Sequence, residues 1–475
     1  MEQYFPMDYF TEEGRWWLPS TPDRKLWGKM TFDADGISLE IDGCFWTEAV
    51  TTSTAGAIEF GFPQRRTAEV VHGRTRTGTS FTLFVVQGMA SLHPDLEAAS
   101  TLTVEGALRG GTVTQDSFEE VWFDLDQLEA WWDPPPIVDL GDDKHTVTVA
   151  ASEVELASIS LASATLRVVA GVAGTSGQGR VDLQRWVSVC VVVVEPQVMA
   201  TLAGDYARPM QELLMFCLGA PVRIMDVRVS FVDLVTERQT SGEFFFKKVE
   251  AKARPITRSS LLNYTSHCVY AVGDDLIPPE TLIRRWFEWW PKLKTAVSML
   301  NAQSSAPFMF QESSFLFAFQ AAESASMMLH GTKELPDDEH ARRVDEISRA
   351  LESDGVGAAN RERAMRLFSR NDKPLKIGVD EMATYVGLTH ALNGTTLGKL
   401  AAGLRGKVAH PGAGSPNYVL RHWAAELLRW VVRIRILMLL VENDDAVRSK
   451  MKTRHALQQT IERINGELIQ HPDQT

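Results

Sequence analysis

The chain has 475 residues, of which 44% are hydrophobic and 23% are charged, and this composition excludes a disordered or collagen-like protein. Its formal net charge of −13 argues against a protein that coats nucleic acid nonspecifically, because binding to many phosphates requires a basic surface. The length exceeds that of one ordinary domain, so we expect two or three domains.

Positive charge is concentrated in the last 75 residues of the chain. Residues 401–475 carry eleven Lys and Arg against seven Asp and Glu, a local charge of +4, which leaves −17 for residues 1–400. An anionic ligand is therefore expected to prefer this C-terminal segment.

The sequence predicts a cytoplasmic protein with no membrane segment, no metal and no cofactor. The N-terminus carries acids where a secretory signal carries bases and an apolar core. The longest apolar run, residues 187–194, is far shorter than the roughly 20 residues of a membrane helix. The cysteines lack the spacing of a zinc site or a disulfide framework, so we expect them to be buried and reduced: Cys44, Cys190, Cys217 and Cys268.

Residues 1–275 are expected to form a β-rich domain. Short segments alternate apolar and polar residues with a period of two and are separated by turns: 30–32, 37–41, 80–86, 121–123, 146–149 and 187–194. This spacing predicts an antiparallel sandwich or barrel, with the sandwich favoured, and the βαβ alternation of a nucleotide-binding sheet is missing. One helix is expected at Pro209–Phe216, packed across a sheet.

A glycine-rich stretch, residues 171–179, is the only segment here that resembles a phosphate-binding loop. It lacks the Lys-Ser/Thr ending of a P-loop and the GxGxxG spacing after a strand. We therefore expect a flexible hairpin loop.

Residues 276–475 are expected to form an all-α domain. The apolar periodicity changes near residue 275, where Pro279 and Glu280 suit the first turn of a helix. Helices are predicted at 280–302, 310–331, 336–353, 357–371, 379–390, 395–409, 416–442 and 445–468.

The helix predicted at 416–442 has Ser415 as its expected N-cap and Pro416 at its first position. Its apolar body contains three arginines, which excludes an unaided membrane span. We expect a central bundle helix with a narrow basic stripe, in which Arg429 and Arg433 lie one turn apart, and such a helix often also forms a subunit interface.

Tryptophan pairs at 16–17 and 131–132 and the trio Trp286, Trp289 and Trp290 have two interpretations. They can stack on bases or sugars, but they accompany apolar neighbours without a local basic cluster, which favours packing in cores or at domain junctions.

The candidate catalytic residues are Arg405 and His410. Arginine offers a fixed charge and a planar fork for a phosphodiester, and a histidine near neutrality can transfer the proton of an attacking or leaving hydroxyl. Similar spacings occur elsewhere, at Arg65 or Arg66 with His72 and at Arg448 with His455. The context favours Arg405 and His410, because the pair ends an apolar helical segment beside a Pro-Gly break.

A family resemblance adds to this context. Residues 300–465 resemble the HEPN superfamily, whose all-α bundle carries an R-x4-6-H motif before a late helix. The segments Gly14-Arg15-Trp16-Trp17-Leu18-Pro19, 28–32 and 39–43 are similar to the opening of the ApeA N-terminal domain, which is known joined to a HEPN domain in bacterial anti-phage proteins. The run 315–323 is similar to the early helix of that HEPN domain, which ends in a glutamate.

The resemblance implies a metal-independent endoribonuclease that acts as a homodimer through its HEPN domains. Two copies of the motif would then supply an acid and a base at one cleft, and Glu323 would orient Arg405 or His410. The implied substrate is host RNA such as tRNA, cleaved to a 2′,3′-cyclic phosphate in abortive infection after a phage-derived trigger. Candidate contacts to the RNA backbone are Lys407, Arg421, Arg429 and Arg433.

Two alternatives stay open. HEPN nucleases usually place a polar residue after the motif arginine, whereas this chain has Gly406, although Lys407 can supply charge instead. Gly406 therefore favours the first alternative, a non-catalytic protein that dimerises and binds a nucleotide or a partner. Carbohydrate binding through the tryptophans of the β-rich region rests on composition alone.

Overall fold

A computed structural model describes most of the chain, with gaps between its described segments. The described residues are 9–33, 35–46, 65–89, 100–132, 138–140, 147–149, 153–177, 180–246, 268–270, 272, 274–305, 309–369, 371–409 and 417–471. The chain divides into a β unit, residues 1–211 and 222–256, and a helical unit, residues 212–221 and 257–475. The last change from the β unit to the helical unit falls between residues 256 and 257, whereas the sequence predicts the domain boundary at about residue 275.

The β unit contains an antiparallel sheet of thirteen strands in the order β11-β12-β13-β8-β14-β15-β7-β5-β4-β1-β2-β3-β6. Its strands are β1 Phe10–Trp17, β2 Leu26–Asp33, β3 Gly36–Ile41, β4 Arg65–Thr75, β5 Ser80–Met89, β6 Ser100–Val104, β7 Gly106–Arg109, β8 Ser117–Leu125, β11 Glu153–Ser160, β12 Ala164–Gly177, β13 Arg180–Val198, β14 Ile224–Val232 and β15 Gln239–Phe246. A separate pair joins β9 Val138–Leu140 to β10 Val147–Val149, and α1 spans Leu128–Trp132.

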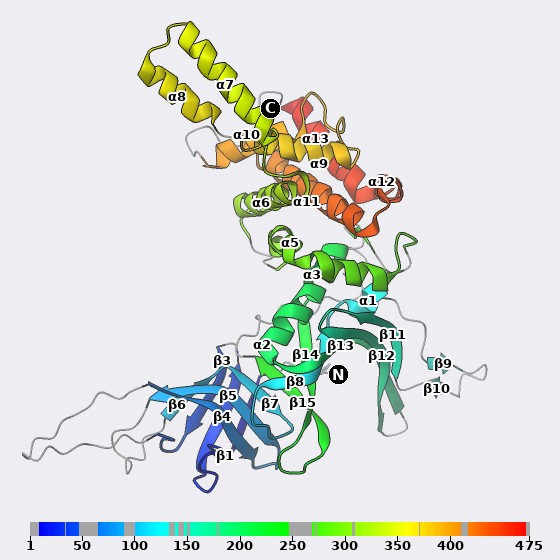
Figure 1. The fold of residues 1–475 in the computed structure, drawn as a ribbon. Coiled ribbons are helices and arrows are strands. Elements are labelled where there is room, and N and C mark those ends of the chain that lie inside the picture. Colours follow the sequence, from blue (N-terminus) through cyan, green and yellow to red (C-terminus); the bar gives the residue numbers. More distant parts are fainter. Residues whose placement is uncertain are drawn as a thin grey trace, which may run out of the picture. The chain divides into compact units, whose positions relative to one another are not determined.

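Strands β1 to β6 form a barrel, because β6 pairs with β3 and also with β5, where Gln87 lies opposite Thr103. Figure 1 shows these strands in blue. Alternate residues fill the interior, among them Trp16, Met30 and Phe32, all fully buried. The prediction of an antiparallel β-rich domain, sandwich or barrel, is confirmed, and these six strands take the barrel form because one continuous sheet curls to close on itself.

The other strands continue as an open sheet with one apolar and one polar face. On β8, Val121 and Phe123 are buried, whereas Trp122 between them is half-buried, as the alternation of a strand dictates. Helix α2, Met199–Leu202, contacts β13 and β8 and is followed by a π-helical turn, Ala203–Ala207, and by α3, Arg208–Leu218. The helix predicted at Pro209–Phe216 is therefore confirmed.

The glycine-rich stretch forms a hairpin with a much shorter loop than predicted. Residues 171–177 belong to β12 and pair with β13 from Gly171 opposite Trp186 to Gly177 opposite Arg180. Only residues 178–179 connect the strands, and they lie outside the described residues. The predicted loop is wrong for residues 171–177, whose backbone groups are used by the neighbouring strand.

The helical unit is all-α in the part that the structure describes. Its helices are α5 Pro279–Ser305, α6 Gln311–His330, α7 Asp337–Ser353, α8 Ala358–Phe368, α9 Leu375–Tyr385, α10 Leu397–Ala409, α11 Tyr418–Val441, α12 Asp444–Lys452 and α13 His455–Gln470. Helix α11 is buried along nearly its whole length and contacts α5, α6, α9, α10, α12 and α13. The predicted central bundle helix is confirmed. None of the described helices is both long and apolar enough to cross a membrane.

Several predicted helix ends are wrong. The helix predicted at 445–468 is two helices, α12 and α13, separated at Thr453 and Arg454, and the helix predicted at 379–390 runs from Leu375 to Tyr385. Helix α11 is capped by Asn417, whose side-chain oxygen accepts hydrogen bonds from the backbone N–H groups of Val419 (2.9 Å) and Leu420 (3.2 Å). The predicted cap, Ser415, and Pro416 lie outside the described residues.

The cysteines and several of the tryptophans are buried, as the sequence predicts. All four cysteines are buried, and none of them forms a disulfide within the described residues. Trp16, Trp131 and Trp286 are almost completely buried, and the Trp286 ring stacks on that of Trp290 with centroids 5.7 Å apart. Core packing therefore accounts for these tryptophans.

Candidate functional site

Helix α10 presents Arg405 from a fixed position in the bundle. The Asp380 carboxylate of α9 accepts hydrogen bonds from the Gly398 N–H (2.7 Å) and the Thr396 hydroxyl (2.8 Å), which caps the first turn of α10. Gly398 permits this approach, because a Cβ there would lie 2.0 Å from the Lys376 carbonyl oxygen. The face of α10 toward the core consists of Leu397, Leu400, Ala401 and Leu404.

Arg405 is exposed on α10 and contacts α6. Its guanidinium carbon lies 5.2 Å from the centroid of the buried Phe319 ring, which is a cation–π arrangement. Glu323 follows Phe319 by one helical turn and is half-buried. Within the described residues, neither Arg405 nor Glu323 forms an ion pair. The structure thus brings Arg405 to the turn of α6 that precedes Glu323, and neither charge has an ion pair among the described residues.

The second catalytic candidate, His410, lies outside the described residues, as do Pro411 and Gly412. Helix α10 ends at Ala409, directly before the histidine. The pairing of Arg405 with His410 therefore stays a prediction.

The arginines of α11 have protein partners or buried surroundings. Arg421 is 6% exposed and pairs with Glu312 at 2.6 Å, while Arg429 is 4% exposed and donates hydrogen bonds to the Ser314 carbonyl (3.0 Å) and hydroxyl (2.7 Å). Glu312 and Ser314 belong to α6. These contacts join α11 to α6, so an RNA backbone can reach the two arginines only if the helices separate.

Arg433 is also buried, and burial lowers the pKa of its guanidinium to about 10. Glu426, which forms an ion pair with Arg429, opposes this shift, whereas the positive charge of Arg429 adds to it. Arg433 remains cationic at neutral pH. In contrast with these residues, Lys407 is only half-buried in the last turn of α10, two residues from Arg405.

The competing Arg-His spacings have structural explanations in part. His72 is buried in β4, its Nε2 lies 2.9 Å from the Val113 carbonyl oxygen, and burial lowers its pKa. Arg448 is held by Asp445 at 2.8 Å, and its Nε donates a hydrogen bond to the Tyr385 carbonyl at 3.0 Å. His72 thus ties β4 to the segment at Val113, and Arg448 ties α12 to α9 at Tyr385, so both side chains have structural roles.

A cavity of about 580 Å³ lies elsewhere in the helical unit. None of its lining residues belongs to α6 or α10; they are Trp289, Tyr385, Arg435, Met438, Leu439, Glu442, Asn443, Asp444, Asp445 and Arg448. Three of these are carboxylates and two are arginines, so the lining is not a basic surface for RNA.

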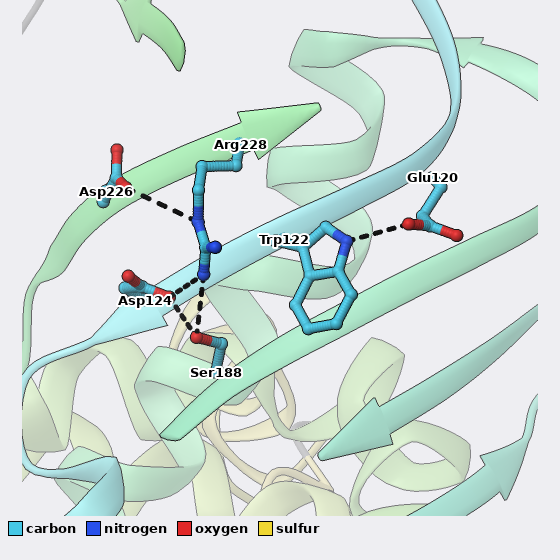
Figure 2. Close-up of polar contacts among 6 residues, drawn as sticks. All are labelled: Glu120, Trp122, Asp124, Ser188, Asp226 and Arg228. Atoms are coloured by element: carbon cyan, nitrogen blue, oxygen red, sulfur yellow. Dashed lines mark hydrogen bonds and ion pairs between the residues drawn. The ribbon is translucent and has the colours of Figure 1, made fainter. Parts of the chain in front are cut away.

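The polar face of the β unit carries a charged cluster that the sequence reasoning missed. Figure 2 shows Arg228 of β14 beside Asp124 of β8 (3.4 Å), Asp226 (3.7 Å) and the Ser188 hydroxyl of β13 (3.3 Å). The Trp122 indole donates a hydrogen bond to Glu120 at 2.9 Å. The sequence signal for this cluster is the alternation Glu120-Trp122-Asp124, which places charged and aromatic side chains on one face of β8.

Aromatic rings and arginines alternate across this cluster. The Arg228 guanidinium carbon lies 5.6 Å from the Trp122 ring and 5.5 Å from the Trp186 ring, and Arg167 lies 6.0 Å from Trp122. Burial and the neighbouring charges of Asp124 and Glu243 raise the pKa of Asp226 to about 6. Each drawn polar group has a partner within the cluster, so the arrangement stiffens the exposed sheet face and shows no nucleophile activated by a base.

No group of His, Cys, Asp or Glu that could hold a metal ion occurs in the described ranges. The cluster of Figure 2 contains ion pairs and cation–π contacts around Arg228.

Comparison with known protein families gives a match in the N-terminal part of the chain. A family model described as ApeA N-terminal domain 1 matches residues 12–263. No curated protein and no solved structure matches the chain. The match covers more than half of the sequence and includes nearly all of the described strands.

Proposed function

The chain belongs to the family of ApeA N-terminal domain 1, which indicates anti-phage defence, and from this premise we propose that its helical unit is a metal-independent HEPN endoribonuclease. The β unit would sense a phage-derived trigger or restrain the nuclease. Cleavage of host RNA such as tRNA would then halt growth and stop phage spread in an abortive infection.

The observation that carries the ribonuclease proposal is the setting of Arg405. It is exposed, held by a capped helix, and has no ion pair among the described residues, so its guanidinium edge is available to a phosphate. Contact with the Phe319 ring restricts the side chain and reduces the entropy lost when an anion binds.

The proposed reaction is attack of a ribose 2′-hydroxyl on the adjacent phosphate. Arg405 binds the phosphate and stabilises the charge that develops on its oxygens, and His410 removes the 2′-hydroxyl proton. The 5′-oxygen leaves with a proton from the second histidine of a homodimer, and the 2′,3′-cyclic phosphate remains on the other fragment. Glu323 orients Arg405 or His410, and Lys407 adds positive charge beside the RNA backbone.

Gly406 does not oppose this proposal on steric grounds. A Cβ at that position would meet no atom of the described residues within 4 Å, so the polar residue usual in HEPN nucleases would fit beside them. The glycine leaves open the alternative of a non-catalytic protein that dimerises and binds a nucleotide or a partner. Intact RNA together with a stability loss in Arg405→Ala would favour that alternative.

The test compares wild type with His410→Ala in cells challenged with phage and with purified protein on total RNA. We expect the substitution to abolish protection and to lower RNA cleavage by at least about 100-fold, the usual contribution of a general acid or base. Sequencing of RNA ends that carry 2′,3′-cyclic phosphate identifies the cut site.

His455→Ala is the matched control, because Arg448 and His455 have similar spacing and His455 is exposed at the start of α13. It should leave cleavage and protection unchanged. Equal activity of wild type and His410→Ala would remove the ribonuclease proposal.

A further inference from the structure

Helices α7 and α8 form a hairpin, here called the arm, that extends away from the other helices of its unit (Figure 1). No residue of either helix is buried. A helix that buries no face is stable only marginally, because most helical stability in proteins comes from tertiary packing.

The base of the arm is closed by paired backbone groups. The Lys373 N–H donates a hydrogen bond to the Thr332 carbonyl (2.8 Å), and the Glu334 N–H donates one to the Asn371 carbonyl (2.9 Å). The Asn371 side chain also bonds the backbone N–H (3.0 Å) and carbonyl (2.8 Å) of Leu335. These bonds fix where the two helices leave and rejoin the bundle.

An apolar seam runs along the arm and stays accessible to solvent. On α7 it consists of Val344, Ile347 and Leu351, half-buried residues that recur at the spacing of one helix face. At the end of α8, Leu367 is 68% exposed and Phe368 is 46% exposed. Two helices do not cover this seam, so a further surface is needed to bury it.

We propose that the arm packs against the arm of a second copy of this chain as a four-helix bundle. Helix α7 carries six carboxylates against three arginines, and α8 carries three arginines against one glutamate. A two-fold axis that sets α7 of one copy against α8 of the other brings opposite charges together twice, whereas pairing of like helices brings like charges together. The bundle also covers the seam of both copies.

The charges left over inside the arm support this pairing. Four arginines are paired with glutamates of the same arm: Arg342 with Glu346, Arg343 with Glu339, Arg361 with Glu352 and Arg366 with Glu362. Among the described residues, Asp338, Asp345 and Arg349 of α7 and Arg363 of α8 form no ion pair. In the proposed bundle Arg363 of one copy faces Asp345 of the other. The arm holds more carboxylates than arginines, which disfavours RNA as its occupant.

This inference rests on the proposed function for its homodimer and names a surface that holds the two copies together. The arm lies outside the helices α6 and α10 that carry Arg405 and Glu323. Self-association and RNA cleavage can therefore be measured separately on the same full-length samples.

The test is a charge swap followed by sedimentation equilibrium of the full chain. Arg363→Glu and Asp345→Lys should each raise the dimer dissociation constant roughly tenfold, because each reversal replaces two attractive contacts with repulsive ones. The double variant restores opposite charges and should return the constant close to that of wild type. Both positions are exposed, so the substitutions spare the fold.

Arg463→Glu on α13, an equally exposed reversal outside the arm, is the control and should leave the constant unchanged. A dimer that is insensitive to both single reversals, or a double variant no tighter than the singles, would overturn the arm interface. That result would not bear on the ribonuclease proposal. If His410→Ala lost cleavage while the charge-swap variants behaved as expected, the loss would concern catalysis alone.

Discussion

Asp226 is a residue whose environment opposes its charge. It lies among Asp124, Glu243 and Arg228, and its side chain is 17% exposed. Burial raises its pKa to about 6, and the two carboxylates add to the rise more than Arg228 offsets it. The folded chain therefore holds the Asp226 proton more tightly than the unfolded chain, where an aspartate has a pKa of about 3.9.

This pKa makes a pH-dependent contribution to stability. As the pH rises from about 4 to about 6, the unfolded state loses the proton first, so the folded state loses stability relative to it. We expect Asp226→Asn to raise the free energy of unfolding by about 2 kcal/mol at pH 8 and by much less at pH 4.5. Urea unfolding at both pH values measures this, with the exposed Asp205→Asn as control. An equal effect at both pH values would contradict the assignment.

The burial of Arg421, Arg429 and Arg433 could not be derived from spacing. The sequence predicts that Arg429 and Arg433 share one face of a helix, and it correctly places that helix at the centre of the bundle. It contains no signal that α6 covers the basic face with Glu312 and Ser314. Partners distant in the chain decide whether a charged stripe is a ligand surface or an internal contact.

At the scale of elements, the cap that Asp380 forms on α10 links stability to the proposed catalysis. Asp380→Ala removes two hydrogen bonds at the helix start and should cost about 1 kcal/mol. Because Arg405 lies on the same helix, we also expect slower RNA cleavage by folded protein at saturating substrate. Thermal unfolding and initial rates measure the two effects.

Asn417→Ala is the matched control, because it removes the cap of α11 at a similar cost in stability without touching α10. The two variants should unfold alike and differ in cleavage. If both lost cleavage equally, general destabilisation would explain the result.

The type of each predicted strand and helix followed from the sequence, but many strands, such as β4, β11 and β12, were not predicted, and several ends and connections did not follow. Alternation revealed the strands, and apolar periodicity revealed the helices. The break at Thr453 and Arg454 contains neither Gly nor Pro, and the apolar periodicity continues across it. The sequence therefore predicted one helix where the structure has two. The barrel depends on the pairing of β6 with both β3 and β5. Nothing in the strand patterns of these segments indicates that they pair.

At the scale of the whole molecule, the cysteines can report how the two units unfold. Cys190 belongs to the β unit, while Cys217 and Cys268 belong to the helical unit although Cys217 precedes β14 and β15 in the sequence. The Val269 N–H donates a hydrogen bond to the Cys217 carbonyl at 2.8 Å. Burial raises the pKa of the Cys190 and Cys268 thiols to about 11.

We expect these thiols to resist alkylation at pH 8 in the native protein, since burial blocks access and disfavours the reactive thiolate. In increasing urea, Cys217 should become reactive together with Cys268. Pulsed alkylation followed by mass spectrometry assigns each thiol to a transition. Exposure of Cys217 with Cys190, ahead of Cys268, would contradict the division of the chain.

The closed base of the arm also has a consequence for engineering the protein. Since Thr332 and Lys373 are hydrogen-bonded across the base, the chain ends there are already adjacent, and whatever lies between them is an insertion in a continuous bundle. A short turn or a foreign domain with close termini can therefore replace the arm without new strain in the bundle. The site offers a place to attach a fluorescent reporter or to graft a different association module onto the same helical bundle.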